Sequence, residues 1–378
     1  MNAPALERRA DPRRFAEIER RHRRAFAWEP QGWIPLGIHV ANPEYVKGLS
    51  YDRWLDPEPF LDVQTRYLID TLDVGSDLLP VVAINHTGDA GTSSLFGAKM
   101  FMPETASATL QDVGPTPLPV FGDIREAAAF GVPPLSAGIQ PELERMALHY
   151  RRHLPDWVEV VGPMPSGPVS LAMELRGSAF LLDLVDEPGL CRRLIDACAD
   201  TQVAVERRLC ELLGTPPDRR PTNFGIRSPG MRLGEDSLCH LSPAMIREFA
   251  GPPCRRINAA WGGTGHVHFC SLPHSRHEHI YEALLGMPEV SVVSSQFGFE
   301  FYERRLKDLR GRLAVEAFYG AAYRHVRAVY GGFREWANDF VPRFRNESGL
   351  VLYFQVESVE EGRELWAAWQ EAHRRGPA

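Results

Sequence analysis

The second half of the chain alternates short apolar segments with segments of helical spacing, and this alternation constrains the fold more than any other feature. Apolar segments at 290–295, 313–318 and 350–354 are each followed by a stretch whose apolar residues recur at helical intervals. Parallel strands need such crossovers, because the chain must return to the end of the sheet where the previous strand began before it can form the next strand. The pattern therefore predicts an α/β fold with parallel strands.

Further apolar segments bring the strand candidates to about eight, the number found in a (β/α)8 barrel. They lie at 33–40, 78–84, 158–161, 169–175, 222–226 and 265–270. We expect a single (β/α)8 TIM barrel over residues 31–378, with an N-terminal helical arm over residues 1–30 and a loop-rich insertion at 91–133. An open doubly wound sheet is the alternative, but no glycine-rich phosphate loop follows the first strand candidate.

Composition narrows the class of protein. The formal net charge is -7, and the Arg-rich first residues are interleaved with acidic ones, so the chain offers no basic face for nucleic acid. No apolar run reaches the length of a membrane span, and the first residues lack a signal-peptide core. The six cysteines include no close Cys-x-x-Cys pair, which indicates reduced thiols. We expect a cytoplasmic protein that binds neither nucleic acid nor a membrane.

The strand candidate at 265–270 carries the residue types of a metal site. His266, His268 and Cys270 alternate with Val267 and Phe269, so a strand places the three polar side chains on one face. Imidazole nitrogen and thiolate sulfur are ligands that zinc prefers. The alternative is a buried strand with a small free cysteine and hydrogen-bonded histidines, because a His-x-Cys pattern is short and recurs by chance.

In a parallel barrel the active site lies at the carboxyl ends of the strands. The polar residues that follow the strand candidates are His39, Asn42, Asn85, His86, Asp89, Glu174, Arg176, Arg227, Glu235, Asp236, His268, Cys270, Ser294, Ser295, Gln296, Glu316, Tyr319, Gln355 and Glu357. A mouth with so many ionisable groups favours an enzyme over a passive binding module. We select Glu235, Asp236, His86 and Arg227 as catalytic candidates. A catalytic zinc site needs three protein ligands, and Glu357 is the expected third beside His268 and Cys270.

Four blocks of sequence occur in an order that we find in one superfamily. They are 167–177 with the Leu/Asp run that follows to 188, 234–243, 265–271, and 349–352. The third looks like a His-x-Cys-Gly strand with Ser271 in place of the glycine. Together the blocks resemble the uroporphyrinogen decarboxylase superfamily, and within it the cobalamin-dependent methyltransferase-like branch.

The resemblance implies a (β/α)8 barrel and two candidate activities. The methyltransferase branch holds zinc with its His-x-Cys pair and a late cysteine, and the zinc activates a thiol acceptor. His268 and Cys270 match that pair, but the position resembling the late cysteine falls near Val356, with Glu357 beside it. The decarboxylases bind propionate groups with an N-terminal arginine motif, and residues 33–45 contain no arginine.

Three functions remain open at this point. One is zinc-dependent methyl or alkyl transfer to a thiol or similar acceptor, with a corrinoid as the methyl donor. Another is a decarboxylase-like lyase that acts on a tetrapyrrole or other carboxylate substrate. The third is a non-catalytic homologue that has kept the barrel and lost the ligand set. The expected partners are a small-molecule substrate, a corrinoid protein and, in a homodimer, a second copy of the chain.

Overall fold

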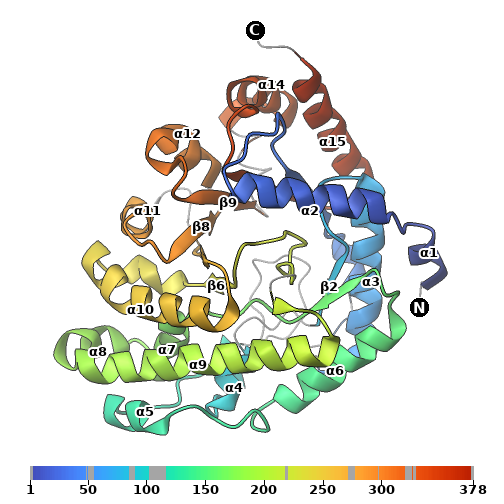
Figure 1. Ribbon diagram of the computed structural model, residues 1–378. Helices are drawn as coiled ribbons and strands as arrows, with labels where there is room; N and C mark the ends of the chain where they lie inside the picture. The colour runs from blue at the N-terminus through green and yellow to red at the C-terminus, as the bar shows by residue number, and fades with distance from the viewer. Residues whose placement is uncertain are drawn as a thin grey trace.

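A six-stranded parallel sheet forms the centre of the molecule (Figure 1). The computed structural model describes residues 3–47, 49, 55–84, 90–101, 116–217, 220–270, 277–296, 298–319, 326 and 329–375. The sheet order is β1-β10-β9-β8-β7-β6. Its strands are β1 (Leu36–Val40), β6 (Arg232–Gly234), β7 (Gly265–His268), β8 (Val290–Ser295), β9 (Ala314–Tyr319) and β10 (Leu350–Val356).

Two more parallel strands, β2 (Val81–Ala83) and β5 (Glu159–Val161), pair with each other in a separate sheet. A single parallel bridge between Ser166 and Gly234 connects the chain after β5 to β6. The short strands β3 (Met100–Phe101) and β4 (Thr116–Pro117) form an antiparallel pair. The expected α/β fold with parallel strands is confirmed. A closed eight-stranded barrel is not shown, because the ladders among the described residues do not join into one ring.

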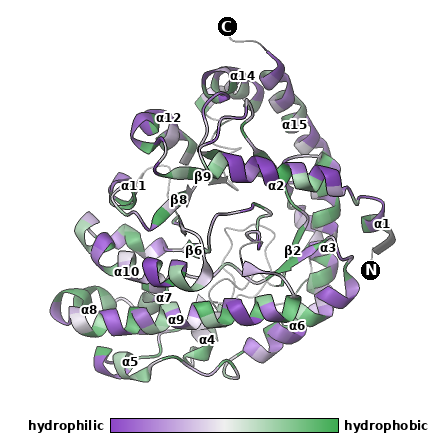
Figure 2. Ribbon diagram, in the orientation of Figure 1, coloured by the Kyte–Doolittle hydropathy of each residue, from purple (hydrophilic) through white to green (hydrophobic). Residues whose placement is uncertain are grey.

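Helices surround the strands (Figure 1). Figure 2 shows hydrophobic and hydrophilic residues alternating along them, as expected for helices with one face on a core. In chain order, the described α-helices are α1 (Ala3–Glu7), α2 (Pro12–Phe26), α3 (Pro57–Val74), α4 (Ala90–Leu95), α5 (Ile124–Phe130), α6 (Gln140–His153), α7 (Pro168–Arg176), α8 (Phe180–Asp186), α9 (Pro188–Leu213), α10 (Pro243–Trp261), α11 (Glu278–Leu285), α12 (Gly298–Leu309), α14 (Phe333–Phe344) and α15 (Val359–Arg374). Ser242 caps α10 by accepting from the Met245 amide, with Pro243 at the first helical position, as the sequence predicts.

Alternation along the strands separates an inner core from an outer one. On β10, Val351 and Tyr353 belong to a small apolar cluster, whereas Leu352 and Phe354 belong to the large cluster packed against the helices. Successive side chains of a strand point to opposite faces, so the small cluster lies on the inner face of the sheet. Phe26 of α2 also belongs to it, so the helix of the expected N-terminal arm contributes to the inner core.

Two strand predictions were wrong. Residues 169–175 lie within helix α7, which begins at Pro168 after Gly167. Residues 222–226 form a tight turn, in which the Gly225 amide donates to the Thr222 carbonyl, 3.0 Å away. Gly225 has a φ of +72°, and a Cβ there would lie 2.7 Å from the Leu79 carbonyl oxygen, so the chain cannot run extended at this point. The strand next to β7 is β6 instead.

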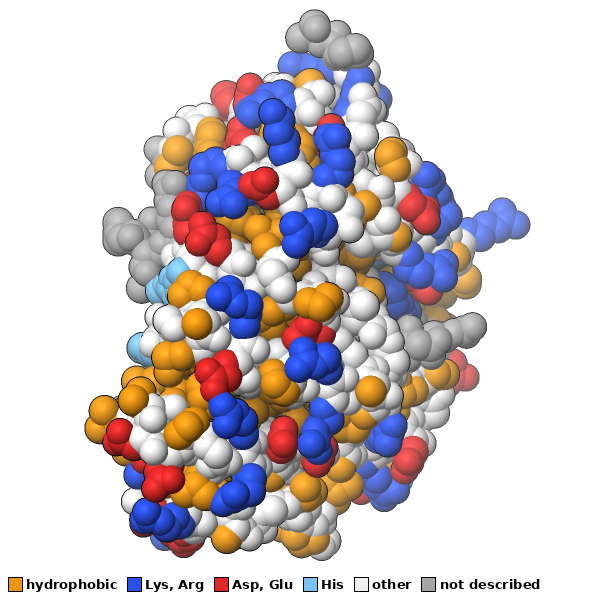
Figure 3. Space-filling model, turned by 60° about the vertical axis from the view of Figure 1, so that its left-hand side comes forward, with side chains coloured by type: hydrophobic (Ala, Val, Ile, Leu, Met, Phe, Trp, Pro, Cys, Tyr) orange, Lys and Arg blue, Asp and Glu red, His pale blue; other side chains and the backbone are white. Residues whose placement is uncertain are grey.

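None of the described helices is long and apolar enough to cross a membrane. Figure 3 shows basic, acidic and hydrophobic side chains interspersed over the face that it draws.

Candidate functional site

Three side chains with metal-ligand atoms converge at the carboxyl ends of β6 and β7. The ligand atoms of Asp236, His268 and Cys270 all lie within 4.8 Å of one another. Among the described residues, these three form the group of His, Cys and acidic side chains that could hold a metal ion. The Cys270 Sγ lies 3.7 Å from Nε2 of His268. The Cys270 backbone amide donates to Oδ1 of Asp236 over 2.6 Å.

The register of two neighbouring strands creates this cluster. Gly234 of β6 pairs with His268 of β7, and the Glu235 amide donates to the His268 carbonyl over 2.7 Å. Asp236 and Cys270 each follow the paired residue by two positions, so the two chains carry them side by side beyond the last rung of the ladder. The cluster therefore follows from strand pairing, and it lies where a parallel α/β sheet places its sites.

The electrostatic surroundings differ between the two sequence-predicted ligands. Burial, helped by the Arg232 charge, lowers the pKa of His268 well below its usual value, so its imidazole is neutral at neutral pH. Cys270 is exposed as a residue, but the chain crowds its thiol. Burial of the thiol, followed by the Asp236 charge, raises the pKa of Cys270 to about 12, so a metal ion must displace a proton from the sulfur.

A buried polar network lies beneath the cluster. Ser294 Oγ lies 3.1 Å from Nδ1 of His268, and it accepts a 3.0 Å hydrogen bond from Nη2 of Arg232. Glu316 Oε1 lies 3.4 Å from the same hydroxyl and 3.5 Å from Arg232 Nε. Glu316 Oε2 lies 3.1 Å from Nε2 of His266. Burial alone would raise the pKa of Glu316, but Arg232 and His266 outweigh it and hold that pKa below its usual value.

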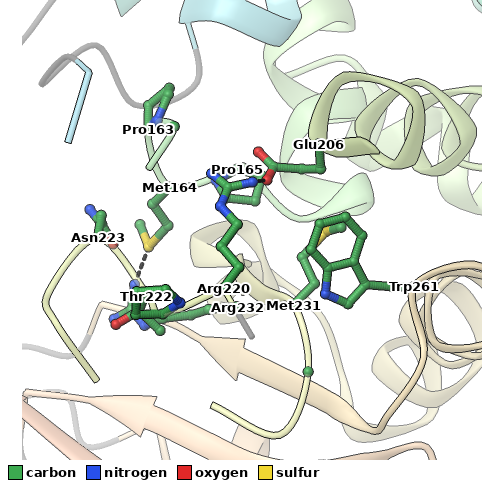
Figure 4. A pocket seen from close by; sticks show the side chains of 13 residues that line it. Pro163, Met164, Pro165, Glu206, Arg220, Thr222, Asn223, Met231, Arg232 and Trp261 are labelled. Carbon is green, nitrogen blue, oxygen red and sulfur yellow. Dashed lines mark hydrogen bonds and ion pairs between the residues drawn. The ribbon is translucent and has the colours of Figure 1, made fainter. Parts of the chain in front are cut away.

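Arg232 is the residue that sequence reasoning missed. Its side chain is 3% exposed, and its guanidinium lies 4.7 Å from the Phe224 ring centroid. Figure 4 shows its guanidinium in contact with the Met164 sulfur, and both residues line a small cavity of about 40 Å³, which an ion pair between Glu206 and Arg220 also lines. The available signal was an arginine between two apolar residues just before Gly234, since a charge within a buried strand requires a partner.

The candidate catalytic residues lie in different places. Asp236 belongs to the cluster, whereas the buried Glu235 carboxylate accepts from the amides of Val169 (3.2 Å) and Ser170 (2.9 Å) at the start of α7. Burial raises the pKa of Glu235 to about 7, although these two hydrogen bonds act against the shift. The structure thus places Glu235 as a cap for α7, and its catalytic role stays a prediction.

Arg227 lies at the amino ends of the strands, away from the expected mouth. Its Nη2 lies 2.8 Å from Oε1 of Glu159, the first residue of β5, and 3.6 Å from Oε2 of Glu19. It also lines a pocket together with Thr264, just before β7, and Ser291, near the start of β8. A strand at 222–226 would have placed Arg227 at the carboxyl ends of the strands. Residues 222–226 form a turn instead, and Arg227 lies at the opposite, amino ends.

Glu357, the expected third ligand, is not part of the cluster. It is exposed beyond β10, where its backbone amide donates to Glu361. Asp236 lies in the cluster with His268 and Cys270 instead, because β6 and not β10 is the neighbour of β7. His86, the remaining catalytic candidate, lies outside the described residues.

No family model matches the chain, and no curated protein matches its sequence. Among solved structures, the chain is similar to a methyltransferase from Methanosarcina mazei, with a TM-score of 0.67 and 15% sequence identity. The similarity covers 94% of this chain and 98% of that one. At this identity the similarity establishes a shared fold over nearly the whole length of both chains.

Proposed function

We propose that this protein is a zinc-dependent methyl or alkyl transferase. The convergence of Asp236, His268 and Cys270 at the carboxyl ends of β6 and β7 carries the proposal. The shared fold with a methyltransferase supports it, as does the resemblance of residues 265–271 to the zinc-binding strand of the methyltransferase branch.

The donor set fits zinc. It offers one imidazole nitrogen, one thiolate sulfur and one carboxylate oxygen, and each is an ordinary zinc ligand. Three protein ligands with a further position left for substrate is the composition of a catalytic zinc site, whereas structural sites fill all four positions from the protein. In this assignment Asp236 replaces the late cysteine that the resemblance leads one to expect.

Bound zinc would supply Lewis acidity, which lowers the pKa of an acceptor thiol and makes a thiolate at neutral pH. The protein holds the ligands in place for this. Asp236 fixes the Cys270 backbone through its amide, and the neutral His268 presents a nitrogen that carries no competing proton. A corrinoid donor would supply the methyl group to the acceptor sulfur, with the electron pair of the cobalt–carbon bond left on cobalt and the thiol proton released to solvent.

Methylcobalamin and a small thiol provide the test. Zinc-loaded protein should accelerate demethylation of methylcobalamin, followed by its visible spectrum, and His268→Ala and Cys270→Ser should abolish the acceleration. Cys239→Ser is the matched control, because Cys239 lies in the same region but outside the cluster. Equal rates for the wild type and Cys270→Ser would remove the basis of the proposal.

A parallel titration with a porphyrin or porphyrinogen tests the decarboxylase alternative. Of the two arginines expected at the mouth, Arg176 pairs with Asp183 at 2.9 Å, and Arg227 lies at the amino ends of the strands, where it pairs with Glu159 at 2.8 Å. Neither offers an unpaired positive charge at the mouth for propionate groups. A spectral change on titration with a porphyrin or porphyrinogen would favour the decarboxylase, and we expect none.

A further inference from the structure

Ser294 contacts three groups that make different demands on one hydroxyl. Its Oγ accepts from Nη2 of Arg232 at 3.0 Å, lies 3.4 Å from Oε1 of Glu316, and lies 3.1 Å from Nδ1 of His268. The hydroxyl is fully buried, so bulk solvent does not reach it. A serine hydroxyl has one proton to donate and two lone pairs that accept.

One arrangement satisfies all three contacts. Arg232 can only donate, so it occupies one lone pair of the hydroxyl. The Glu316 carboxylate, held ionised beside Arg232, can only accept, so it takes the single hydroxyl proton. The remaining lone pair then has to accept a proton from Nδ1 of His268. The opposite choice, donation from Ser294 to Nδ1, would leave two oxygens with facing lone pairs in a buried site, which is costly.

His266 lies two residues away on the same strand and has the opposite arrangement. Its Nε2 lies 3.1 Å from the acceptor-only Oε2 of Glu316, although not with ideal alignment, and its Nδ1 lies 2.8 Å from the Ser228 hydroxyl. The carboxylate therefore favours a proton on Nε2 of His266, with Nδ1 accepting from Ser228. Glu316 thus influences which nitrogen is protonated in both histidines. It contacts His266 directly and acts on His268 through Ser294.

We propose that Ser294, oriented by the buried Arg232–Glu316 pair, is a positioning residue that holds His268 as the tautomer protonated on Nδ1. The Nε2 lone pair then points toward Cys270, 3.7 Å away, where a thiol S–H can donate to it before metal binds. That the lone pair serves as a zinc ligand rests on the proposed function. The tautomer itself does not, since it is a property of the metal-free protein.

The test reads the tautomer directly. Chelator-treated protein labelled with ¹⁵N-histidine is studied by long-range ¹H–¹⁵N correlation, which distinguishes protonation on Nδ1 from protonation on Nε2. The His268 and His266 signals are assigned by their loss in His268→Gln and His266→Gln. We expect His268 protonated on Nδ1 and His266 protonated on Nε2. His268 protonated on Nε2 in the wild type would overturn the inference, whether or not any variant folds.

Variants test whether Ser294 is the cause. Ser294→Ala should give a mixture of His268 tautomers and weaken zinc binding by about 10- to 100-fold in chelator competition. Ser294→Thr, which keeps the hydroxyl, should restore both. Ser295→Ala is the matched control, because Ser295 contacts Tyr281 on the other face of β8. An unchanged tautomer in Ser294→Ala would contradict the assignment. The expected tautomers in a protein that binds no zinc would uphold this inference and refute the proposed function.

Discussion

The backbone amide of Cys270 donates a 2.6 Å hydrogen bond to Oδ1 of Asp236, 34 residues earlier in the chain. This bond joins the segments that follow β6 and β7 just beyond the last paired residues of the two strands. It holds the backbone of Cys270 beside the Asp236 carboxylate. Asp236 is thus both a member of the cluster and the hydrogen-bond partner of the Cys270 backbone.

Exchanging the acidic residue tests which carboxylate is the third ligand. Asp236→Asn keeps an oxygen that can accept from the Cys270 amide but removes the charge, so we expect zinc affinity to fall by about 10- to 100-fold with little loss of stability. Glu357→Gln should leave zinc affinity unchanged, because Glu357 lies outside the cluster. Competition with a chromophoric chelator measures both. A larger loss in Glu357→Gln than in Asp236→Asn would restore Glu357 as the ligand.

Glu235 should matter for stability. Its carboxylate satisfies the Val169 and Ser170 amides at the start of α7, which have no partner within the helix. Glu235→Ala leaves these buried donors unsatisfied and should lower the free energy of unfolding by about 1–3 kcal/mol. Urea denaturation measures the loss, and zinc content of the folded variant should stay at the wild-type level. Unchanged stability together with lost transfer activity would instead support the catalytic role expected from the sequence.

The buried Arg232–Glu316 pair should be costly to break. Both side chains are at most 3% exposed, so Glu316→Gln leaves a guanidinium charge without its partner and should destabilise the protein by about 3–5 kcal/mol. The control is Glu371→Gln on the surface, whose partners Arg334 and Arg375 are each 52% exposed, with an expected loss below about 1 kcal/mol. Chemical denaturation compares them. Similar losses for the two variants would mean that the inner pair contributes no more than a surface pair.

Acid should destabilise the protein through His22 on α2. His22 is fully buried, with Nε2 2.9 Å from the Asp77 carbonyl oxygen and Nδ1 accepting from the Arg227 amide at 3.1 Å. Burial lowers its pKa from 6.5 to about 4. Between these values the unfolded chain binds a proton that the folded protein does not, so stability present above pH 6.5 is lost as the pH falls.

The expected loss is about 1.4 kcal/mol for each pH unit in that interval. Urea midpoints of the wild type and His22→Gln, measured from neutral pH down to pH 4.5, isolate the contribution of this histidine from that of other groups. The variant should show a shallower dependence on pH. Parallel curves for the two proteins would show that His22 does not lose its neutral form on unfolding.

Local pattern was sufficient to predict part of the fold. Strand β7 was recognisable from its alternation of polar and apolar residues, and β8 to β10 were recognisable as short, mainly apolar segments. Strand β6 was not, because Arg232-Leu233-Gly234 is short and contains an arginine and a glycine, which strands disfavour. Helix α7 was read as a strand because its cap, Glu235, lies 66 residues from Val169 in the sequence.

The site was predictable to the same degree. His268 and Cys270 share a short segment, so their spacing alone indicates that they can bind one ion. Which carboxylate lies beside His268 and Cys270 depends on which strand pairs with β7, and no local pattern reveals strand order. The sequence favours Glu357 as the third ligand, whereas the pairing of Gly234 with His268 brings Asp236 into the cluster.

The zinc content of the purified protein tests the central claim most directly. Protein prepared without added chelator and dialysed against metal-free buffer should contain about one zinc ion per chain, as a three-ligand site requires. Cys270→Ser and Asp236→Asn should each lower that content, and Cys239→Ser should not. Zinc well below one ion per chain in the wild type, with no further change in Cys270→Ser, would contradict the account.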